Sequence, residues 1–456
     1  MSAKSQDRLI PKTALKGSLR DYRQPAGTAL IKRGEGFFAW QNERREHGLW
    51  PYAKSTASAP RTQCSARTDS GEEIAGVNFA SQDYLSLASH PQIKQAAIEA
   101  IEEYGVHSAG SAALLGNTRH SLQLERTISD YLNERETVLY PTGWSAGFAS
   151  VQGLVRPYDH VVLDVLAHSC LQEGARAATQ NIHFHGHLNV EGLARRLQRI
   201  RDTDTENGIL VVTESLFSMH SDTPDIAALR AACDEYGATL LVDCAHDFGC
   251  IGDDGLGHLG LQNMIDDVDI IIGSFSKTFA SNGGFVSVKS RATAEYLKYY
   301  SATQTFSNAL SPAQAATVLS AFDIVRSQEG RERRRRLMDN IVYMRTEMAK
   351  AGMETLGNPS PIVPVRVGAE GLARIASREL ACAGAITNLV EYPAVPQGAA
   401  CFRVQLMADH SAEDVDRLVR LMREAIGRAD LACRSDREYD DLRGAMRGRN
   451  AASSAA

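Results

Sequence analysis

Residues 269–285 read DIIIGSFSKTFASNGGF. A short apolar run of the kind found in buried β-strands leads into a serine-rich turn that carries Lys277, and two glycines follow. Lysine is costly to bury, so its place directly after a strand suggests chemistry that uses the loss of the ammonium charge, such as a Schiff base. A surface lysine in a turn is the simpler alternative, and this segment alone does not choose between the two.

Similar apolar runs lie on both sides of this segment, and stretches of helix length separate them. Near-continuous apolar strands alternating with helices are typical of a mostly parallel sheet that is covered on both faces. In open sheets of this class, ligands bind at the carboxyl ends of the strands. The runs are ETVLYPTG (136–143), HVVLDVLAH (160–168), GILVVTESLF (208–217), ATLLVDCAH (238–246) and GGFVSV (283–288).

The composition excludes several classes of protein. The 456 residues carry 49 Lys and Arg against 55 Asp and Glu, and this net charge of -6 argues against a nucleic-acid binder. No apolar run approaches the roughly 18–20 residues of a transmembrane segment, and the start lacks the apolar core of a signal peptide. The eight cysteines form no C-x-x-C pair, so we expect reduced thiols in the cytoplasm. No metal site is predicted.

Two further strand ends carry polar side chains. In LLVDCAHDFG (240–249), Asp243 and His246 follow a strand, and a buried acid there can pair with a pyridinium nitrogen and make that ring an electron sink. In VLDVLAHSCLQEGA (162–175), His168 can stack its imidazole on a cofactor ring. Singly, the acid is as well explained as a helix cap and His168 as an ordinary histidine. Their order of His, Asp-x-x-His and Lys favours a cofactor site.

Eight segments between about residues 76 and 428 form a pattern in fixed order: FASQDYLSLASHP, GSAALLGNTRHSLQLE, PTGWSAGF, LAHSCLQEGA, TESLFSMHSD, VDCAHDFGCIG, GSFSKTF and YPAVPQGAACFRVQLMADHSAEDVD. Together they resemble the α-oxoamine synthases, pyridoxal phosphate (PLP) enzymes that include serine palmitoyltransferase and 8-amino-7-oxononanoate synthase. The resemblance implies the α/β fold of fold-type I PLP-dependent transferases. That fold has a large domain with a mostly parallel sheet between helices and a smaller α/β C-terminal domain.

We therefore predict four parts of the chain. Residues 1–75 form an N-terminal arm and linker, and residues 76–310 form the large PLP-binding domain. Residues 311–430 form the small domain with its connecting helix, which opens at Ser311-Pro312 because serine caps helices and proline suits the first helical position. Residues 431–456, charged and then AASSAA, are predicted to be a disordered tail.

The resemblance implies a role for each residue at the strand ends. Lys277 matches the Schiff-base lysine, which also serves as the base at the amino acid Cα. Asp243 matches the acid that pairs with the pyridine nitrogen. His246 matches a histidine near the cofactor's phenolic oxygen, and Ser218 a serine on the same side of the ring. His168 matches the histidine that stacks on the ring.

A phosphate dianion needs hydrogen-bond donors and helix N-termini. By resemblance, these come from Thr142, Gly143 and Trp144, which match the family's Ser-Gly-aromatic turn, and from Ser274, which keeps the hydroxyl of the family's threonine. In the family, the second subunit also contributes to the phosphate site. Thr305, in TQTFSNALSP, is the predicted contribution, and it implies a homodimer.

The substrate site is predicted from three further positions. Arg403, in CFRVQL, matches the arginine that binds the substrate carboxylate with its planar fork, and an ordinary ion pair is the alternative. Gln82 stands where the family has asparagine and is expected to contact the substrate amino acid. Ala112 replaces an arginine of the family, and with Leu114 and Leu115 it predicts a wider and drier entrance for an acyl chain.

The chain also departs from the family pattern elsewhere. FHGHLNVEGL (184–193) lacks the usual H-N-D, His220-Ser221 replaces Asp-Gly, and Cys244 replaces a glutamate. Because the predicted cofactor residues are unchanged, these departures bear on the substrate. The basic run RERRRR (331–336) fits either binding of a CoA phosphate or acidic carrier protein, or, more simply, a solvated helix face.

The resemblance implies a decarboxylating condensation. A small amino acid, with serine or alanine favoured, would react with a medium- or long-chain acyl thioester of CoA or a carrier protein to give an α-amino ketone, in lipid or natural-product biosynthesis. An aminotransferase or another PLP enzyme acting at Cα is the main alternative, since a fold does not fix a reaction. A non-catalytic partner subunit is a further one, against which the retained Lys277 argues.

Overall fold

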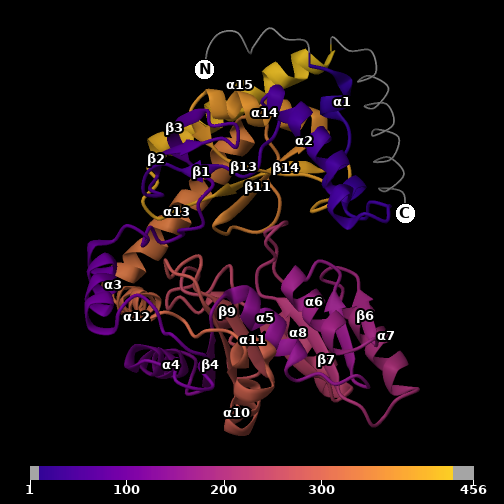
Figure 1. The fold of residues 1–456 in the computed structure, drawn as a ribbon, viewed down its shortest axis with the longest axis vertical. Helices are drawn as coiled ribbons and strands as arrows, with labels where there is room; N and C mark the ends of the chain where they lie inside the picture. The colour runs from indigo at the N-terminus through magenta and orange to yellow at the C-terminus, as the bar shows by residue number, and fades with distance from the viewer. Residues whose placement is uncertain (1–9, 435–456) are drawn as a thin grey trace. The chain divides into compact units, whose positions relative to one another are not determined.

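The computed structural model describes residues 10–434. The chain divides into two compact units. We call residues 82–338 the sheet unit, and residues 10–81 together with 339–434 the terminal unit. The boundary at 338 falls inside helix α13 (Gln328–Lys350) (Figure 1).

The sheet unit contains a seven-stranded mixed sheet in the order β4-β10-β9-β8-β7-β5-β6. Neighbouring strands from β9 to β6 are parallel, whereas β10 runs antiparallel to both β4 and β9. All the strands expected from the apolar runs are present, and the predicted α/β fold is confirmed. The strands are β4 (Glu136–Tyr140), β5 (His160–Asp164), β6 (Ile182–His185), β7 (Ile209–Glu214), β8 (Thr239–Asp243), β9 (Ile270–Ser274) and β10 (Gly284–Val288).

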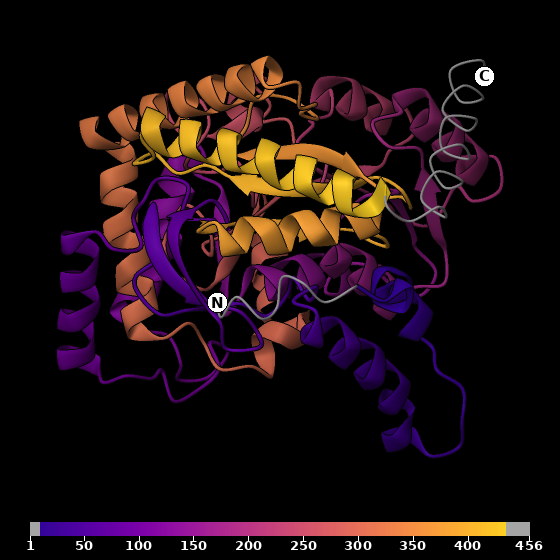
Figure 2. The ribbon, with the colours of Figure 1, turned by 90° about the horizontal axis from the view of Figure 1, so that it is seen from above.

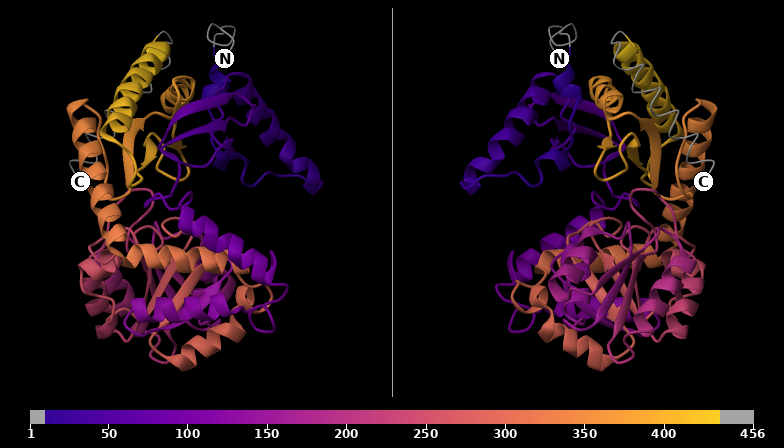
Figure 3. Two further views of the ribbon diagram at one scale, coloured as in Figure 1. Left: turned by 90° about the vertical axis from the view of Figure 1, so that its left-hand side faces the viewer. Right: turned by 90° about the vertical axis from the view of Figure 1, so that its right-hand side faces the viewer.

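Helices lie on both sides of this sheet (Figure 3). Several begin at capping side chains that the sequence supplies: Thr142 before α5, Asp225 before α8 and Ser311 before α12, the last as predicted. The helices are α3 (Pro91–Tyr104), α4 (Arg119–Tyr131), α5 (Gly143–Gln152), α6 (Ser169–Ala178), α7 (Val190–Arg201), α8 (Ile226–Glu235), α9 (Gly257–Leu261), α10 (Arg291–Tyr300), α11 (Ala302–Thr305), α12 (Pro312–Arg326) and the start of α13.

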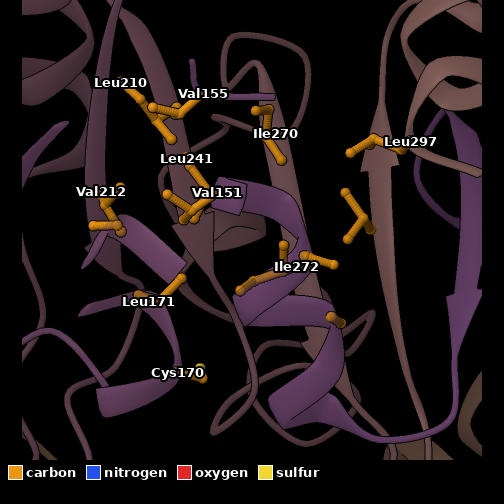
Figure 4. Packing of buried hydrophobic residues seen from close by; sticks show 14 of the residues in the cluster. Val151, Val155, Cys170, Leu171, Leu210, Val212, Leu241, Ile270, Ile272 and Leu297 are labelled. Carbon is orange, nitrogen blue, oxygen red and sulfur yellow. The ribbon is translucent and has the colours of Figure 1, made fainter. Parts of the chain in front are cut away.

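The core of the sheet unit explains why its strands are apolar throughout. Every residue of β7 and of β9 is buried. Val151 of α5 and the nearby Val155 lie among Leu210, Leu241 and Ile270 of three neighbouring strands (Figure 4). Full burial of each such aliphatic side chain stabilises the fold by about 1.5–3 kcal/mol. This packing fixes the strand ends, where the polar residues lie.

The terminal unit joins the two ends of the described chain. β3 pairs with β12 in parallel, so that the N-terminal strands and the C-terminal segment share one sheet, β1-β2-β3-β12. A second sheet has the order β11-β14-β13, and α14 packs beside α15 (Figure 2). The elements are α1 (Lys12–Leu15), η1 (Leu19–Tyr22), η2 (Leu30–Gly34), α2 (Glu35–Glu46), β1 (Ser55–Thr56), β2 (Gln63–Arg67), β3 (Glu73–Asn78), β11 (Ile362–Gly368), α14 (Glu370–Cys382), β12 (Ala385–Ile386), β13 (Asn388–Val390), β14 (Ala400–Gln405) and α15 (Ala412–Arg434).

The predicted disordered tail begins at residue 431, where α15 is still helical, and residues 435–456 lie outside the described residues. The division of the chain into parts at 75 and 310 stays a prediction. Within residues 10–434, no helix has the length and apolar character required to cross a membrane.

Candidate active site

Three neighbouring parallel strands end in polar residues at one edge of the sheet. Glu214 ends β7, Asp243 ends β8 and Ser274 ends β9. The register sets Glu214 opposite Asp243 and Ser274 opposite Gly284, where the antiparallel β10 begins. Polar groups from separate parts of the chain therefore converge at this edge, as expected for ligand sites of open α/β sheets.

Lys277 lies in the turn that follows β9. The amide of Phe275 donates to the carbonyl of Gly283 at 3.0 Å and closes this turn. Gly283 has φ +110°, and a Cβ there would approach Leu310 and Phe275 to 2.9 Å, so the turn requires glycine at this position. Lys277 is half-buried in the turn at the carboxyl edge of the sheet, and its charge lowers the pKa of Asp243 at the end of β8.

Asp243 and Glu214 form a buried acid pair. Burial raises the pKa of Asp243, and the nearby His168 and Lys277 lower it in part. Burial also raises the pKa of Glu214 well above its usual range, and the charge of Asp243 adds to this shift. The amide of Ala245 donates to Asp243 at 2.9 Å. Two adjacent buried carboxyl groups disfavour double ionisation, so the pair retains a proton or attracts a cation.

His246 is fixed by a residue distant in sequence. Its Nδ1 lies 3.0 Å from the Tyr84 hydroxyl, and both side chains are buried. Asp83 shapes the segment that carries Tyr84 by accepting the amides of Leu87 and Ala88 at 2.7 and 2.9 Å. Sequence reasoning missed both Tyr84 and Glu214, although each lies inside a motif quoted above.

His168 is the cap of α6 and is exposed. Its Nδ1 lies 3.0 Å from the Cys170 Sγ and accepts the amide of Cys170 at 3.3 Å. One edge of the imidazole is therefore held by the helix start. Exposure at this edge suits a ring that stacks on a ligand.

The start of α5 and the end of β9 form a polar cradle. The Thr142 Oγ1 accepts the amide of Ser145 at 3.0 Å, and the first-turn amides of a helix attract anions. A Cβ at Gly143 would collide with the side chain of Ser274, so the helix start and the end of β9 lie in contact. The Ser274 hydroxyl also bonds the Ser276 hydroxyl at 2.7 Å. Trp144 is exposed beside this cradle.

Residues 74–421 match the family described as aminotransferase class I and II. The chain belongs to this family. It is 30% identical to the serine palmitoyltransferase of Sphingobacterium spiritivorum, over 85% of this chain and 95% of that protein. It is 31% identical to the 8-amino-7-oxononanoate synthase of Thermoanaerobacter pseudethanolicus, over 78% of this chain and 89% of that protein. Both relatives are α-oxoamine synthases, so the predicted relationship is confirmed.

The fold is similar to that of a solved serine palmitoyltransferase with PLP as internal aldimine. The TM-score is 0.82 at 24% identity, and the match covers 88% of this chain and 100% of that one. The predicted fold-type I architecture is thereby confirmed, and PLP is confirmed as the cofactor of the family. The buried acid pair, the lysine beside it and the hydroxyl-lined helix start fit the ring nitrogen, aldehyde and phosphate of PLP.

Other residues that the family pattern singled out lie in varied surroundings. Ser218 is half-buried in the turn after β7, and Gln82 is half-buried at the start of the sheet unit. The Thr305 hydroxyl donates to the carbonyls of Lys298 and Tyr299, at 3.2 and 3.0 Å, and so closes the end of α10. Its contribution to a second subunit's phosphate site stays a prediction.

Arg403 lies in β14 of the terminal unit. It is buried and stands in register with Pro364 of β11 and Asn388 of β13. Its family role, binding of the substrate carboxylate, stays a prediction.

Two arginines of the basic run 331–336 point into the sheet unit. Arg334 is buried and donates to the carbonyl of Val325 at 2.7 Å, and burial lowers its pKa. Arg333 donates to the carbonyl of Leu85 at 3.0 Å and pairs with Glu329. For these two side chains, the contacts favour a structural role over binding of a phosphate.

Proposed function

We propose that this protein is a PLP-dependent enzyme that condenses a small amino acid, serine or alanine, with an acyl thioester and releases CO2. The observation that carries the proposal is the buried pair of Asp243 and Glu214 beside Lys277 at one edge of the sheet. Strongly perturbed acids next to a lysine in such a position are typical of catalytic sites. The relationship to the α-oxoamine synthases supports the reaction type.

PLP, when bound, supplies the electron sink for bond cleavage at the amino acid Cα. Asp243, with Glu214 beside it on the neighbouring strand, would hold a proton at the ring nitrogen. Lys277 would hold the aldehyde and, once the substrate amino group has displaced its own, would use the freed amine to accept the α-proton of the amino acid. The first-turn amides of α5 and the Ser274 hydroxyl would bind the phosphate, and His168 would pack on the ring.

The reaction class is tested by supplying amino acid and acyl thioester without a keto acid and measuring free thiol and CO2. Both products are expected, and their release should be lost in Lys277→Ala. Lys289→Ala is the matched control, because Lys289 is an exposed lysine just beyond the other end of β10. Turnover only with a keto acid would identify an aminotransferase instead. Borohydride reduction followed by peptide mapping should label Lys277, and a label on another lysine would overturn its role.

The active form that we propose is a homodimer in the cytoplasm. All eight cysteines are free thiols, which suits a reducing compartment. The family's shared phosphate site supports the dimer, with Thr305 as the crossing residue. Full specific activity at a concentration where the protein is a monomer would contradict this part of the proposal.

The acyl donor that we propose has a medium or long chain. Leu114 and Leu115 are 86% and 89% exposed, so this segment offers apolar surface to a ligand. Each buried methylene of an acyl tail contributes about 0.8 kcal/mol. Ala112→Arg should therefore reduce the preference for long over short donors, on CoA and on carrier protein alike. An unchanged preference would show that Ala112 packs away from the acyl chain.

A further inference from the structure

Two departures from the family pattern meet in space. His187 comes from the segment that lacks H-N-D, and Asp222 follows the substituted pair His220-Ser221. The His187 Nε2 lies 3.0 Å from Asp222, and its Nδ1 lies 3.0 Å from Asp164 at the end of β5. One imidazole thus joins the segment after β6 to the end of β5 and to the turn after β7, at the same edge of the sheet as Asp243.

Asp222, the partner of His187 Nε2, is the last residue of a hydrogen-bonded turn, residues 217–222. The amide of Phe217 donates to the carbonyl of Asp222, and the amide of Ser221 donates to the carbonyl of Phe217, both at 2.9 Å. His187 also packs edge-on against the Phe217 ring, with centroids 4.6 Å apart. It therefore touches both ends of the turn that contains Ser218, the predicted neighbour of the phenolic oxygen.

This turn is strained and depends on outside contacts. Ser221 has φ +59° and is fully buried, where the family pattern has glycine. A side chain in this left-handed region is disfavoured. A turn without glycine needs contacts that compensate for the strain, and His187 supplies two of them.

Both bonds together require a charged imidazole. A neutral histidine has one N–H, whereas the imidazolium has two and donates to both carboxylates. Burial lowers the pKa of His187, but the bonds to Asp164 and Asp222 outweigh it and raise the pKa to about 9. Two other titratable groups face it: His185 of β6, whose pKa burial lowers, and His220, whose ring centroid lies 5.8 Å away.

We infer that His187, as an imidazolium, is a positioning residue that clamps the turn 217–222 to β5 and so fixes Ser218 for the cofactor. The cofactor part of this inference rests on the proposed function. The clamp itself does not depend on it. Because the folded-state pKa of His187 lies above the unfolded value of about 6.5, the clamp stabilises fully below that pH and is lost as the pH rises through about 9.

The clamp is tested first on the protein without PLP. Thermal unfolding of wild type and His187→Gln is compared from pH 6 to pH 10. Glutamine keeps one donor but cannot hold a proton, so its Tm should lie about 2–4 °C below wild type at pH 6–7 and converge with it at pH 10. His160→Gln is the control, since it removes a His–Asp pair at the opposite end of β5. It shows how much of any difference comes from losing a His–Asp pair far from the turn 217–222.

A constant difference between wild type and His187→Gln at all pH values would reduce His187 to a packing residue and overturn the inference. Asp222→Asn offers a second measurement should His187→Gln fold poorly. Removing one carboxylate should lower the pH midpoint of the His187 Cε1–H signal in an NMR titration. An unmoved midpoint would likewise overturn the inference.

The effect on the cofactor is measured as PLP affinity. At pH 7, His187→Gln should bind PLP about tenfold more weakly than wild type, and at pH 10 the two should agree within about twofold. Equal affinity at pH 7 would refute the link to Ser218. If the wild type itself bound no PLP, the proposed function would fail, while the unfolding experiment would still decide whether the clamp exists.

Discussion

The two units bury charge in opposite ways. In the terminal unit, Arg44 and Arg374 are fully buried with Glu391. Arg374 donates to Glu391 at 2.7 Å and to the carbonyl of Gly17 at 2.8 Å, and the Tyr52 hydroxyl donates to Glu391 at 3.0 Å. In this network, one carboxylate and several carbonyl oxygens face the two guanidinium groups, while Arg44 Nε and Nη1 make no hydrogen bond within the described residues.

The sheet unit buries two charges of the same sign. Glu214 and Asp243 stand side by side at the strand ends, and burial raises the pKa of both. The nearby Lys277 is only half-buried and compensates the pair in part. Such an arrangement destabilises the empty site and favours a bound cation, such as a protonated ring nitrogen.

Two carboxyl groups buried side by side point to a bound cation, whereas a carboxylate buried between two arginines does not. The network around Glu391 ties the N-terminal arm to the C-terminal part of its unit. The acid pair, in contrast, is fully compensated only when a bound cation, which the chain does not itself supply, lies beside it. Substitutions in the two regions should therefore move different observables.

The largest effect is expected from Glu391→Gln. It leaves Arg44 and Arg374 buried without their counter-charge, which should cost about 3–5 kcal/mol of unfolding free energy. Burial and the charge of Arg374 already lower the pKa of Arg44 to about 10, so this site tolerates no further loss. Denaturant unfolding measures the change, with Glu424→Gln as control, because Glu424 is a half-buried glutamate of α15 that pairs with two surface arginines. A loss below 1 kcal/mol would show that the network is not a closed unit.

Asp243→Asn should act on turnover and spare the fold. A neutral amide cannot hold the proton on the ring nitrogen, so we expect condensation to slow by about 10²- to 10³-fold, as for other lost charge stabilisers. The unfolding midpoint without PLP should not fall, because a buried like charge is removed. Asp225→Asn, which keeps the cap of α8, is the control. Near-normal turnover would rule out the electron-sink role of Asp243.

Features that depend on a short stretch of sequence could be predicted from the sequence. The apolar runs predicted the strands, and the Ser311-Pro312 pair predicted the start of α12. Lys277, Asp243 and His168 were found because each follows a run that is recognisable by itself, and the structure brings the ends of these strands to one edge.

What the sequence did not disclose depends on contacts between distant segments. Glu214 is recognisable as a site residue only from the strand register, which sets it opposite Asp243. Tyr84 contacts His246 from a turn that no pattern of apolar residues in the sequence predicts. The β3–β12 pairing, which gives the N-terminal strands to the terminal unit, likewise joins segments far apart in the chain.

Substitutions of buried residues usually lower the stability of a protein, but Glu214→Gln should raise it at pH 8–9. A carboxyl whose folded-state pKa is raised contributes stability below its unfolded pKa, about 4.3, and this is lost as the pH rises through the folded value. Without PLP, the variant and wild type should therefore agree near pH 4.5, and the variant should melt about 2–4 °C higher at pH 8–9. Glu136→Gln, at the opposite end of the sheet, should show no such trend. A variant that melts lower at pH 8 would show that Glu214 is fully compensated.

The smallest effect is expected from Tyr84→Phe, which removes the hydrogen bond between the Tyr84 hydroxyl and His246 Nδ1. His246 Nδ1 then stays buried without its 3.0 Å partner, at a cost of about 1 kcal/mol in unfolding free energy. Tyr343→Phe removes an exposed bond to Asp416 and should cost less. Because His246 is the proposed neighbour of the phenolic oxygen, Tyr84→Phe alone should also move the pH midpoint of the PLP absorbance band. If stability falls while that midpoint does not move, Tyr84 has a structural role like that of Glu391 and does not act on the cofactor site.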